Sequence, residues 1–440
     1  MPSAAQSTAA GQCVDHRACT ARHVTGALGG RLEVADIFRQ FGAEYRRTHT
    51  LLPSQAKAFQ DILDCRTAAL GGRLEKCDHC GRENPVYCSC CNRHCPKCQM
   101  LAKAKWLAAR STELLPVPYF HAVFTLPHVL NPLIFDNQRL LYSLLFECVA
   151  TTLQEFAADA RHGLGGKLGF TAVLHTWDQQ LNYHVHLHCL IPAGVLSLDR
   201  QEWRHARHNY LFNSEALSLV FRGKFRAALQ AAFDASQLRF RGQTPDQNEA
   251  RRAFARLIPQ LYKTDWVVYL KPSFGGPSQT LDYLGRYTHR IAISNSRLLE
   301  LENGQVHFRY RDRRNGDRLK ELALPAEEFI RRFLQHVLPK GFVRLRHFGF
   351  LANGCKTGAL ARCRELLGAP PPVKAVNLTT PAWIQKLTGV DVTLCRYCHA
   401  GHMIFVCDLP PTRPGRSLPK RLRPPRTLKP LFESTTGDTS

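Results

Sequence analysis

The sequence has no apolar run of the roughly 18–20 residues that a membrane-spanning helix needs. Residues 1–30 are rich in Ala, Ser, Thr and Gly but lack the long apolar core of a secretory signal, and we expect a mobile N-terminal segment. The glycine-rich stretch GLGGKLG (residues 163–169) lacks the Lys-Ser/Thr ending of a phosphate-binding loop, so we expect a hairpin or a connector there and no nucleotide cofactor. These absences predict a soluble, cytoplasmic protein without a membrane partner.

Acidic residues are scarce relative to basic ones. The chain has 35 Asp and Glu against 59 Lys and Arg, which gives a net charge of +24. The basic residues are spread along the whole chain, and a generally basic, solvated surface is one interpretation. An excess this large favours a polyanion, most simply DNA, because its phosphates bind Lys and Arg with release of counterions. The 440 residues, 44% of them hydrophobic, suffice for two or three domains with a sizeable core.

Cysteine, in contrast, is abundant, with 17 residues. An odd number that includes Cys-x-x-Cys pairs favours thiolates on metal in a reducing compartment over disulfides. The pairs Cys77/Cys80 and Cys95/Cys98 stand close together in the sequence, and we predict that these four thiolates hold one structural zinc ion that folds the front domain. Nearby residues offer spare ligands: Cys65, Cys88, Cys90, Cys91 and His94.

A third Cys-x-x-Cys pair, Cys395 and Cys398, stands alone near the end of the chain. It could form a small second zinc site with Cys355 or Cys363, or it could bind no metal, because a lone pair is weak support for a site. A Pro- and Arg-rich stretch follows, which we expect to be disordered and to make non-specific contacts with DNA.

The segment LNYHVHLHCLIPAG (residues 181–194) organises the rest of the chain. Its histidines, His184, His186 and His188, alternate with apolar residues at the period of a β-strand, so all three imidazoles should project from one face. A solvated strand face would explain the alternation, but imidazoles spaced in this way can hold one divalent cation, and we favour the metal interpretation.

A second segment, LDYLGRYTHRIAISN (residues 281–295), carries Tyr283 and Tyr287, which would share one face of a helix. Arg286, His289 and Arg290 surround them with basic side chains. By itself this pair favours the interpretation that both tyrosines are buried aromatic residues. Together with the histidine strand, it suggests a nuclease that attacks DNA through tyrosine.

Several segments of the chain resemble the rolling-circle transposases of the IS91 family, members of the His-hydrophobe-His (HUH) endonuclease superfamily. The segments that carry the resemblance are CRTAALGG (65–72), NRHCPKCQ (92–99), HVHLHCLIPAG (184–194) and YLGRYTHRIAISNSRL (283–298), in the family's order, with weaker matches at 119–133 and 338–353. The likeness extends from about residue 31 to the 360s. The usual pattern near HPHVHCLVP is altered at Val185 and at Ala193, and neither change removes a candidate ligand.

The resemblance implies a metal-dependent tyrosine endonuclease and strand transferase. In the family pattern Tyr283 and Tyr287 occupy the tyrosine positions, and Cys65 and Cys90 usual cysteine positions. Mg²⁺ or Mn²⁺ would be held by the histidine strand, through His186 and His188. His184 is the nearest candidate for a third ligand by face, and Gln179 is another.

The resemblance also implies partners and a location. The partner would be single-stranded DNA at the element ends and at the target. From the residues themselves, we expect Arg286, Arg290 and Lys271 to contact this DNA and aromatic residues such as Trp177 and Phe274 to stack on unpaired bases. The protein would act near the nucleoid of a bacterial-type cell. Two alternatives remain open: a plasmid rolling-circle replication initiator, which would share the chemistry, and a non-catalytic, zinc-dependent DNA-binding protein.

We expect an α+β fold, in which an antiparallel sheet with flanking helices, as in HUH endonucleases, is preceded by a small zinc-binding domain. Strands are predicted at residues 119–126, 170–176, 182–191 and 266–270, with the histidine strand central and the tyrosine helix across its face. Residues 243–250 are predicted as a polar loop. The expected units are a mobile segment (1–30), a zinc- and DNA-binding domain (31–115), a catalytic domain (116–368), a possible zinc ribbon (369–409) and a disordered tail (410–440).

Overall fold

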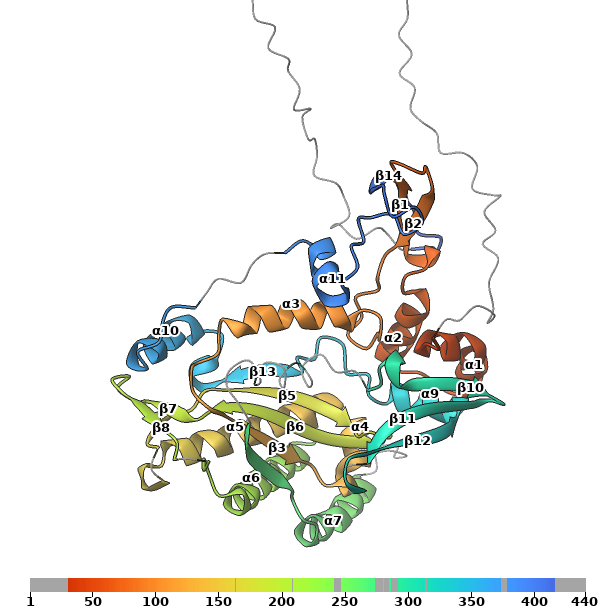
Figure 1. The fold of residues 1–440 in the computed structure, drawn as a ribbon. Helices are drawn as coiled ribbons and strands as arrows, with labels where there is room; N and C mark the ends of the chain where they lie inside the picture. Colours follow the sequence, from red (N-terminus) through yellow and green to blue (C-terminus); the bar gives the residue numbers. More distant parts are fainter. Residues whose placement is uncertain are drawn as a thin grey trace, which may run out of the picture.

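The structure is a computed structural model, which describes residues 31–162, 164–207, 209–240, 247–273, 292–312, 315–372 and 378–415, together with Thr280 and Gly285. Helices and antiparallel strands are mixed along the chain, so the predicted α+β class is confirmed (Figure 1). Every helix in these described parts is too short or too polar to cross a membrane.

The main sheet lies at the centre of the molecule, with the strand order β13-β5-β6-β3-β9 (Figure 1). Its strands are β3 (Tyr119–Thr125), β5 (Phe170–Trp177), β6 (Tyr183–Pro192), β9 (Val268–Ser273) and β13 (Leu345–Phe348). All neighbours pair antiparallel, and the histidine strand β6 is central, as predicted. The short edge strand β13 is not predicted by the sequence pattern, because four partly buried residues carry little periodic signal.

One face of the main sheet packs on helices. Val185, Leu187 and Cys189 of β6 are completely buried in the main core, because they alternate with the histidines. This core also takes residues from α5 (Gln138–Ala158), α6 (Ser214–Asp234) and α7 (Gln247–Lys263). Helices α6 and α7 lie below the sheet in Figure 1. The opposite face of β6 therefore presents the histidines away from the core.

Helix α7 corrects part of the loop predicted at residues 243–250, because it begins at Gln247. Its first turn is polar, which hides the helical signal. The later apolar residues Phe254, Leu257 and Leu261 recur at helical spacing and are buried, and they are what anchor the helix.

A second core joins the front of the chain to residues 292–337. Phe38 of α1 (Val34–Thr48) stacks on Phe59 of α2 (Pro53–Asp64) with ring centroids 4.4 Å apart. Phe38 also meets the edge of Phe333 in α9 (Ala326–Leu334) at 5.4 Å. The sheet of β10 (Leu298–Glu302), β11 (Gln305–Asp312) and β12 (Arg318–Pro325) covers the same core.

A smaller sheet unites the two ends of the described chain. Its strands, in the order β14-β1-β2, are β1 (Gly72–Cys77), β2 (Glu83–Tyr87) and β14 (Met403–Leu409). The prediction that residues 369–409 form a ribbon of their own is therefore wrong. The reason is that β14 finds its hydrogen-bonding partner in β1, far away in sequence, rather than in a neighbouring strand.

The remaining elements connect these layers. Helix α3 (Gln99–Ser111) runs above the main sheet in Figure 1, and α11 (Thr380–Thr388) packs against it. Lys105 of α3 donates a hydrogen bond of 3.3 Å to the Thr380 hydroxyl of α11. The other α-helices and β-strands within the described residues are α4 (Asn131–Asp136), α10 (Lys356–Leu366), β4 (Gly166–Lys167), β7 (Gly194–Ser197) and β8 (Trp203–His205).

Candidate functional site

Three imidazoles meet on the face of the main sheet that points away from its helices. His186 and His188 project from β6, and His175 projects from the neighbouring strand β5. His175 is the antiparallel partner of His186 in the strand register, which places the two side chains on the same face. One ring nitrogen from each of the three lies within 4.8 Å of those of the others, and all three side chains are at least 92% buried. This histidine centre could hold a metal ion.

Hydrogen bonds orient two of the rings. Nδ1 of His186 lies 2.8 Å from the carbonyl oxygen of His184, which can only accept, so Nδ1 carries the proton and Nε2 has the lone pair. Nδ1 of His188 lies 2.8 Å from Nε2 of His121, a buried residue of β3. If Nδ1 of His188 donates in this pair, its Nε2 is also a ligand atom. Such outer partners commonly fix metal-binding histidines.

The structure revises the third ligand. His184 is not part of the histidine centre, because its Nδ1 pairs instead with Nε2 of His128 at 2.8 Å. Burial and the neighbouring His128 lower the pKa of His184. Gln179 lines the cavity beside the centre but is not grouped with the histidines. The residue that sequence reasoning missed is His175, although its place in a predicted strand just before the turn was a usable signal.

The histidine centre lies in the wall of a cavity of about 1530 Å³. Val123, Thr125 and Tyr269 line it from β3 and β9, next to the histidines. Tyr310, Arg311 and Asp312 of β11, together with Asn315 and Arg331, come from the second core and its sheet. A cavity of this size, lined by residues of both cores, has room for a large polar ligand.

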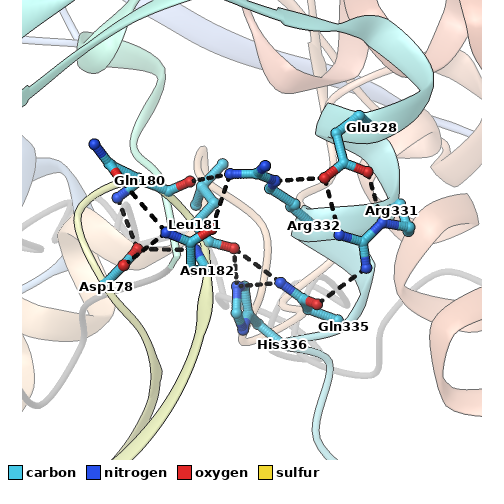
Figure 2. A network of polar contacts seen from close by, with 9 residues as sticks. All are labelled: Asp178, Gln180, Leu181, Asn182, Glu328, Arg331, Arg332, Gln335 and His336. Atoms are coloured by element: carbon cyan, nitrogen blue, oxygen red, sulfur yellow. Dashed lines mark hydrogen bonds and ion pairs between the residues drawn. The ribbon is translucent and has the colours of Figure 1, made fainter. Parts of the chain in front are cut away.

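A network of polar contacts fixes the turn before β6 (Figure 2). Asp178 accepts two backbone N–H bonds of 2.8 Å within the turn, from Gln180 and Asn182. From α9, Arg332 donates to the Gln180 carbonyl at 3.1 Å. Leu181 has a positive φ of 64°, and its side chain is completely buried in the second core. The turn connects β5 and β6 of the main sheet, but its contacts are with α9 and the second core.

Two side chains directly after the end of α9 complete this attachment from the Leu181 side. Gln335 donates a hydrogen bond of 2.8 Å to the Leu181 carbonyl, and Nε2 of His336 lies 3.1 Å from the same oxygen. Glu328 binds both Arg331 and Arg332, and the hydrogen bond from Arg331 holds the pKa of the Glu328 carboxyl at about 2. The position of β6 therefore depends on α9 as well as on its neighbouring strands.

The predicted tyrosines, Tyr283 and Tyr287, lie outside the described residues, as do Arg286 and Arg290. Lys271 is described and exposed on β9, where its ammonium lies 5.1 Å from the centre of the Tyr269 ring. Gly285, between the two tyrosines in sequence, is buried against α3. A Cβ added there would approach the side-chain ends of Leu107 to 2.7 Å and Lys103 to 3.0 Å, so a larger residue would require these side chains to shift.

Cysteines gather at two further places. Cys65, Cys90, Cys95 and Cys98 form the first cysteine cluster, at the end of α2 and the start of α3. Its sulfur atoms are 3.5 Å apart for Cys65 and Cys98 and 3.6 Å apart for Cys90 and Cys98. Both distances are close to the roughly 3.8 Å expected for thiolates that share a tetrahedral zinc ion with Zn–S bonds of about 2.3 Å. The donor set and its spacing fit structural zinc.

The second cysteine cluster consists of Cys77, Cys80, Cys395 and Cys398. The prediction that Cys77, Cys80, Cys95 and Cys98 share one ion is therefore wrong. The pairing of β1 with β14 determines which Cys-x-x-Cys pairs come together. The local spacing of the cysteines in the sequence does not reveal this pairing. Cys355 and Cys363, the partners considered for Cys395 and Cys398, belong to neither cluster.

Comparison with known proteins identifies the family. A family model described as "Putative transposase" matches residues 169–358, and one described as "Transposase zinc-binding domain", of the IS91 type, matches residues 37–126. The chain is 47% identical to "Putative transposase y4qJ" of Sinorhizobium fredii over 378 residues, which cover 85% of this chain and 94% of the relative. The chain belongs to the IS91 family of transposases.

The transposase for insertion sequence element IS801 of Pseudomonas savastanoi pv. phaseolicola is a second relative. It is 32% identical to this IS91-family chain over 353 residues, which cover 79% of the chain and 82% of the relative. No solved structure matches. The matched zinc-binding domain includes the whole first cysteine cluster, together with Cys77 and Cys80, and supports structural zinc in this transposase. The matched transposase region includes the histidine centre.

Proposed function

We propose that this transposase cleaves single-stranded DNA with a tyrosine and rejoins it during rolling-circle transposition. The observation that carries the proposal is the histidine centre, which faces a large cavity in the matched transposase region. Imidazoles whose ring nitrogens lie within 4.8 Å of one another, on the face of the sheet away from the packed core, form a donor set of the kind that binds a divalent cation.

His175, His186 and His188 would hold a divalent cation, Mg²⁺ or Mn²⁺. Nitrogen donors of this kind suit Mn²⁺ better than Mg²⁺, which prefers oxygen ligands and retains its water. When bound, the cation would neutralise charge on the scissile phosphate and orient it. His121 would keep His188 in the orientation that presents Nε2 to the cavity.

The nucleophile would be Tyr283 or Tyr287. The phenol oxygen forms a bond to phosphorus and gives up its proton, and the bond from phosphorus to the 3′ oxygen breaks. The 3′ oxygen takes a proton, so the products are a 5′-phosphotyrosine and a free 3′-hydroxyl. The phosphotyrosine conserves the phosphodiester linkage, so attack by a 3′-hydroxyl on it rejoins DNA without ATP. A second tyrosine would allow a second strand to be held at the same time.

Aromatic and basic residues of the cavity support a preference for single strands. Tyr269 is 42% exposed, lines the cavity and lies beside Lys271, so its ring suits stacking on an unpaired base. Trp177 does not suit this role, because it is 93% buried and stacks on His175 at 4.6 Å between ring centroids. Phe274, the other aromatic considered, lies outside the described residues.

The decisive experiment detects a covalent adduct between the purified transposase and a single-stranded oligonucleotide from the end of its element, with Mn²⁺. Tyr283→Phe and Tyr287→Phe each remove one hydroxyl and should each retain some cleavage, whereas the double variant should form no adduct. If one tyrosine is the sole nucleophile, one single variant alone will abolish the adduct. An adduct in the double variant would refute tyrosine attack, and none in the wild type would favour a non-catalytic DNA-binding protein.

A further inference from the structure

The two halves of the second cysteine cluster are a matched pair of turns. In the first, the Gly81 amide donates a 3.1 Å hydrogen bond to the Cys77 carbonyl, and Gly81 has a φ of +70°. In the second, the His399 amide donates a 3.0 Å bond to the Cys395 carbonyl, and His399 has a φ of +53°. Each Cys-x-x-Cys pair therefore ends in a left-handed residue that turns the chain back around its sulfurs. A turn of this kind directs both cysteine side chains towards one point.

The sulfur atoms of the two turns face one another. Sγ of Cys77 lies 3.7 Å from Sγ of Cys398, and Sγ of Cys80 lies 3.8 Å from Sγ of Cys395. Four thiolates around one tetrahedral zinc ion, with Zn–S bonds of about 2.3 Å, would be about 3.8 Å apart. Backbone amides point at two of these sulfurs, from Cys80 to Cys77 at 3.4 Å and from Gly401 to Cys398 at 3.5 Å. Such N–H contacts stabilise sulfur in its thiolate form.

The two turns of the second cluster approach so closely that there is no room for a side chain at Gly401. A Cβ added at Gly401 would lie 2.6 Å from the Cys77 sulfur and 2.5 Å from Oδ1 of Asp78, so only glycine allows the turns to approach. The Asp78 carboxylate accepts a 2.7 Å bond from the His402 amide, and the Asp78 amide donates a 3.0 Å bond to the His402 carbonyl. These bonds continue the ladder of β1 and β14 into the cluster.

We propose that Cys77, Cys80, Cys395 and Cys398 hold a second structural zinc ion, which clasps the C-terminal segment 378–415 to the front of the chain. Four soft thiolates select zinc over hard cations such as Mg²⁺. This site is distinct from the first cysteine cluster, and it extends beyond the matched zinc-binding domain at residues 37–126, which contains only two of its ligands.

The clasp joins Cys77 to Cys398, which are 321 positions apart in sequence. All strands of the main sheet lie between these two residues in the sequence. The segment that it retains includes α11, which packs on α3, the helix that begins at the first cysteine cluster. The clasp thereby holds α11 on α3 from the outer side, while Gly285 lies against α3 through Leu107. Many large apolar residues of this segment, such as Ile404 and Phe405, are exposed rather than packed in a core of its own, so the ion supplies the attachment.

Zinc stoichiometry tests the clasp in the full chain. The wild type should contain two zinc ions, and the pair variants Cys77→Ser/Cys80→Ser and Cys395→Ser/Cys398→Ser should each contain one. The quadruple variant should also retain one, because both pairs serve the same ion. Cys91→Ser and Cys355→Ser, at cysteines outside both clusters, are matched controls and should retain two. Two ions in the Cys395→Ser/Cys398→Ser variant would overturn the proposal, as would stepwise loss of two ions in the quadruple variant.

A second experiment keeps all cysteines and so avoids any failure of the variants to fold. A protease site is inserted after the exposed Pro372, and the purified chain is cleaved there. The C-terminal fragment should stay with the rest of the molecule while zinc is bound and separate from it after treatment with a zinc chelator. Separation in the presence of full zinc, or retention after complete zinc removal, would show that an ion does not make this attachment.

Discussion

The histidine centre and the second cysteine cluster hold their side chains in opposite ways. The histidines project from paired strands whose other face is buried in the main core, so the sheet sets their spacing whether or not an ion is present. The cysteines project from two turns, with Cys80 exposed and exposed apolar residues on β14. Because the sheet sets its spacing, the histidine centre should be able to release and rebind a metal ion, whereas the second cysteine cluster, which is built on turns, should depend on its ion for shape.

Zinc removal should give the largest effect and test this contrast directly. Apparent binding energies of structural zinc reach about 10–16 kcal/mol in zinc-finger peptides, which exceeds what the small β14-β1-β2 sheet could supply alone. After chelation, hydrogen exchange should lose its protection in β1 and β14 but keep it in β5 and β6. Equal loss in both sheets would mean that the main sheet also depends on zinc. Protection retained in β1 and β14 would mean that the turns are held by packing.

Removal of a single imidazole should abolish most activity without unfolding the chain. His186→Ala deletes a proposed ligand, and adduct formation should fall by about 100-fold or more, because even outer-shell partners of a metal ligand are worth 10–100-fold. The thermal midpoint should move by only a few degrees, and excess Mn²⁺ should restore part of the activity. His184→Ala is the matched control on the same strand, since His184 pairs with His128. A larger loss in the control would return His184 to the candidate ligands.

The attachment of the turn before β6 to the segment directly after α9 should respond to acid. Burial lowers the pKa of His336 from 6.5 to about 4, so the unfolded chain takes up a proton between these values that the folded chain does not. Stability should therefore be intact above about pH 6.5 and fall as the pH drops towards 4, by at most about 3 kcal/mol from this residue. Urea unfolding at several pH values measures the slope. His336→Gln should flatten it, and an unchanged slope would assign the acid sensitivity to other groups.

His121 should have the smallest effect, because it acts through His188. His121→Ala should weaken Mn²⁺ binding by about 10–100-fold, as calorimetry can measure, and saturating Mn²⁺ should restore the rate. His121→Gln keeps a polar group near Nδ1 of His188 and should lose less. Failure of saturating Mn²⁺ to rescue His121→Ala would point to a direct role for this imidazole on the DNA.

Local patterns in the sequence predict much of the main sheet. The alternation around His184, His186 and His188 predicts β6 and both of its faces, because a period of two depends only on neighbouring residues. The register that brings His175 opposite His186 depends on the turn between β5 and β6. The geometry of this turn is set by α9 and the residues directly after it, far along the chain. The cysteine partners depend on pairing across the whole fold, so local spacing suggests the wrong set of four.

The pairing of β1 with β14 has a consequence for the order in which the protein can be made. On the ribosome, at about 5–20 residues per second, the 321 positions between Cys77 and Cys398 take roughly 15–65 seconds to synthesise. During that interval Cys77 and Cys80 are already synthesised, but Cys395 and Cys398 are not. A transposase chain that stops early lacks β14, the edge strand that pairs with β1. The complete β14-β1-β2 sheet therefore exists only on chains in which the main sheet has already been synthesised.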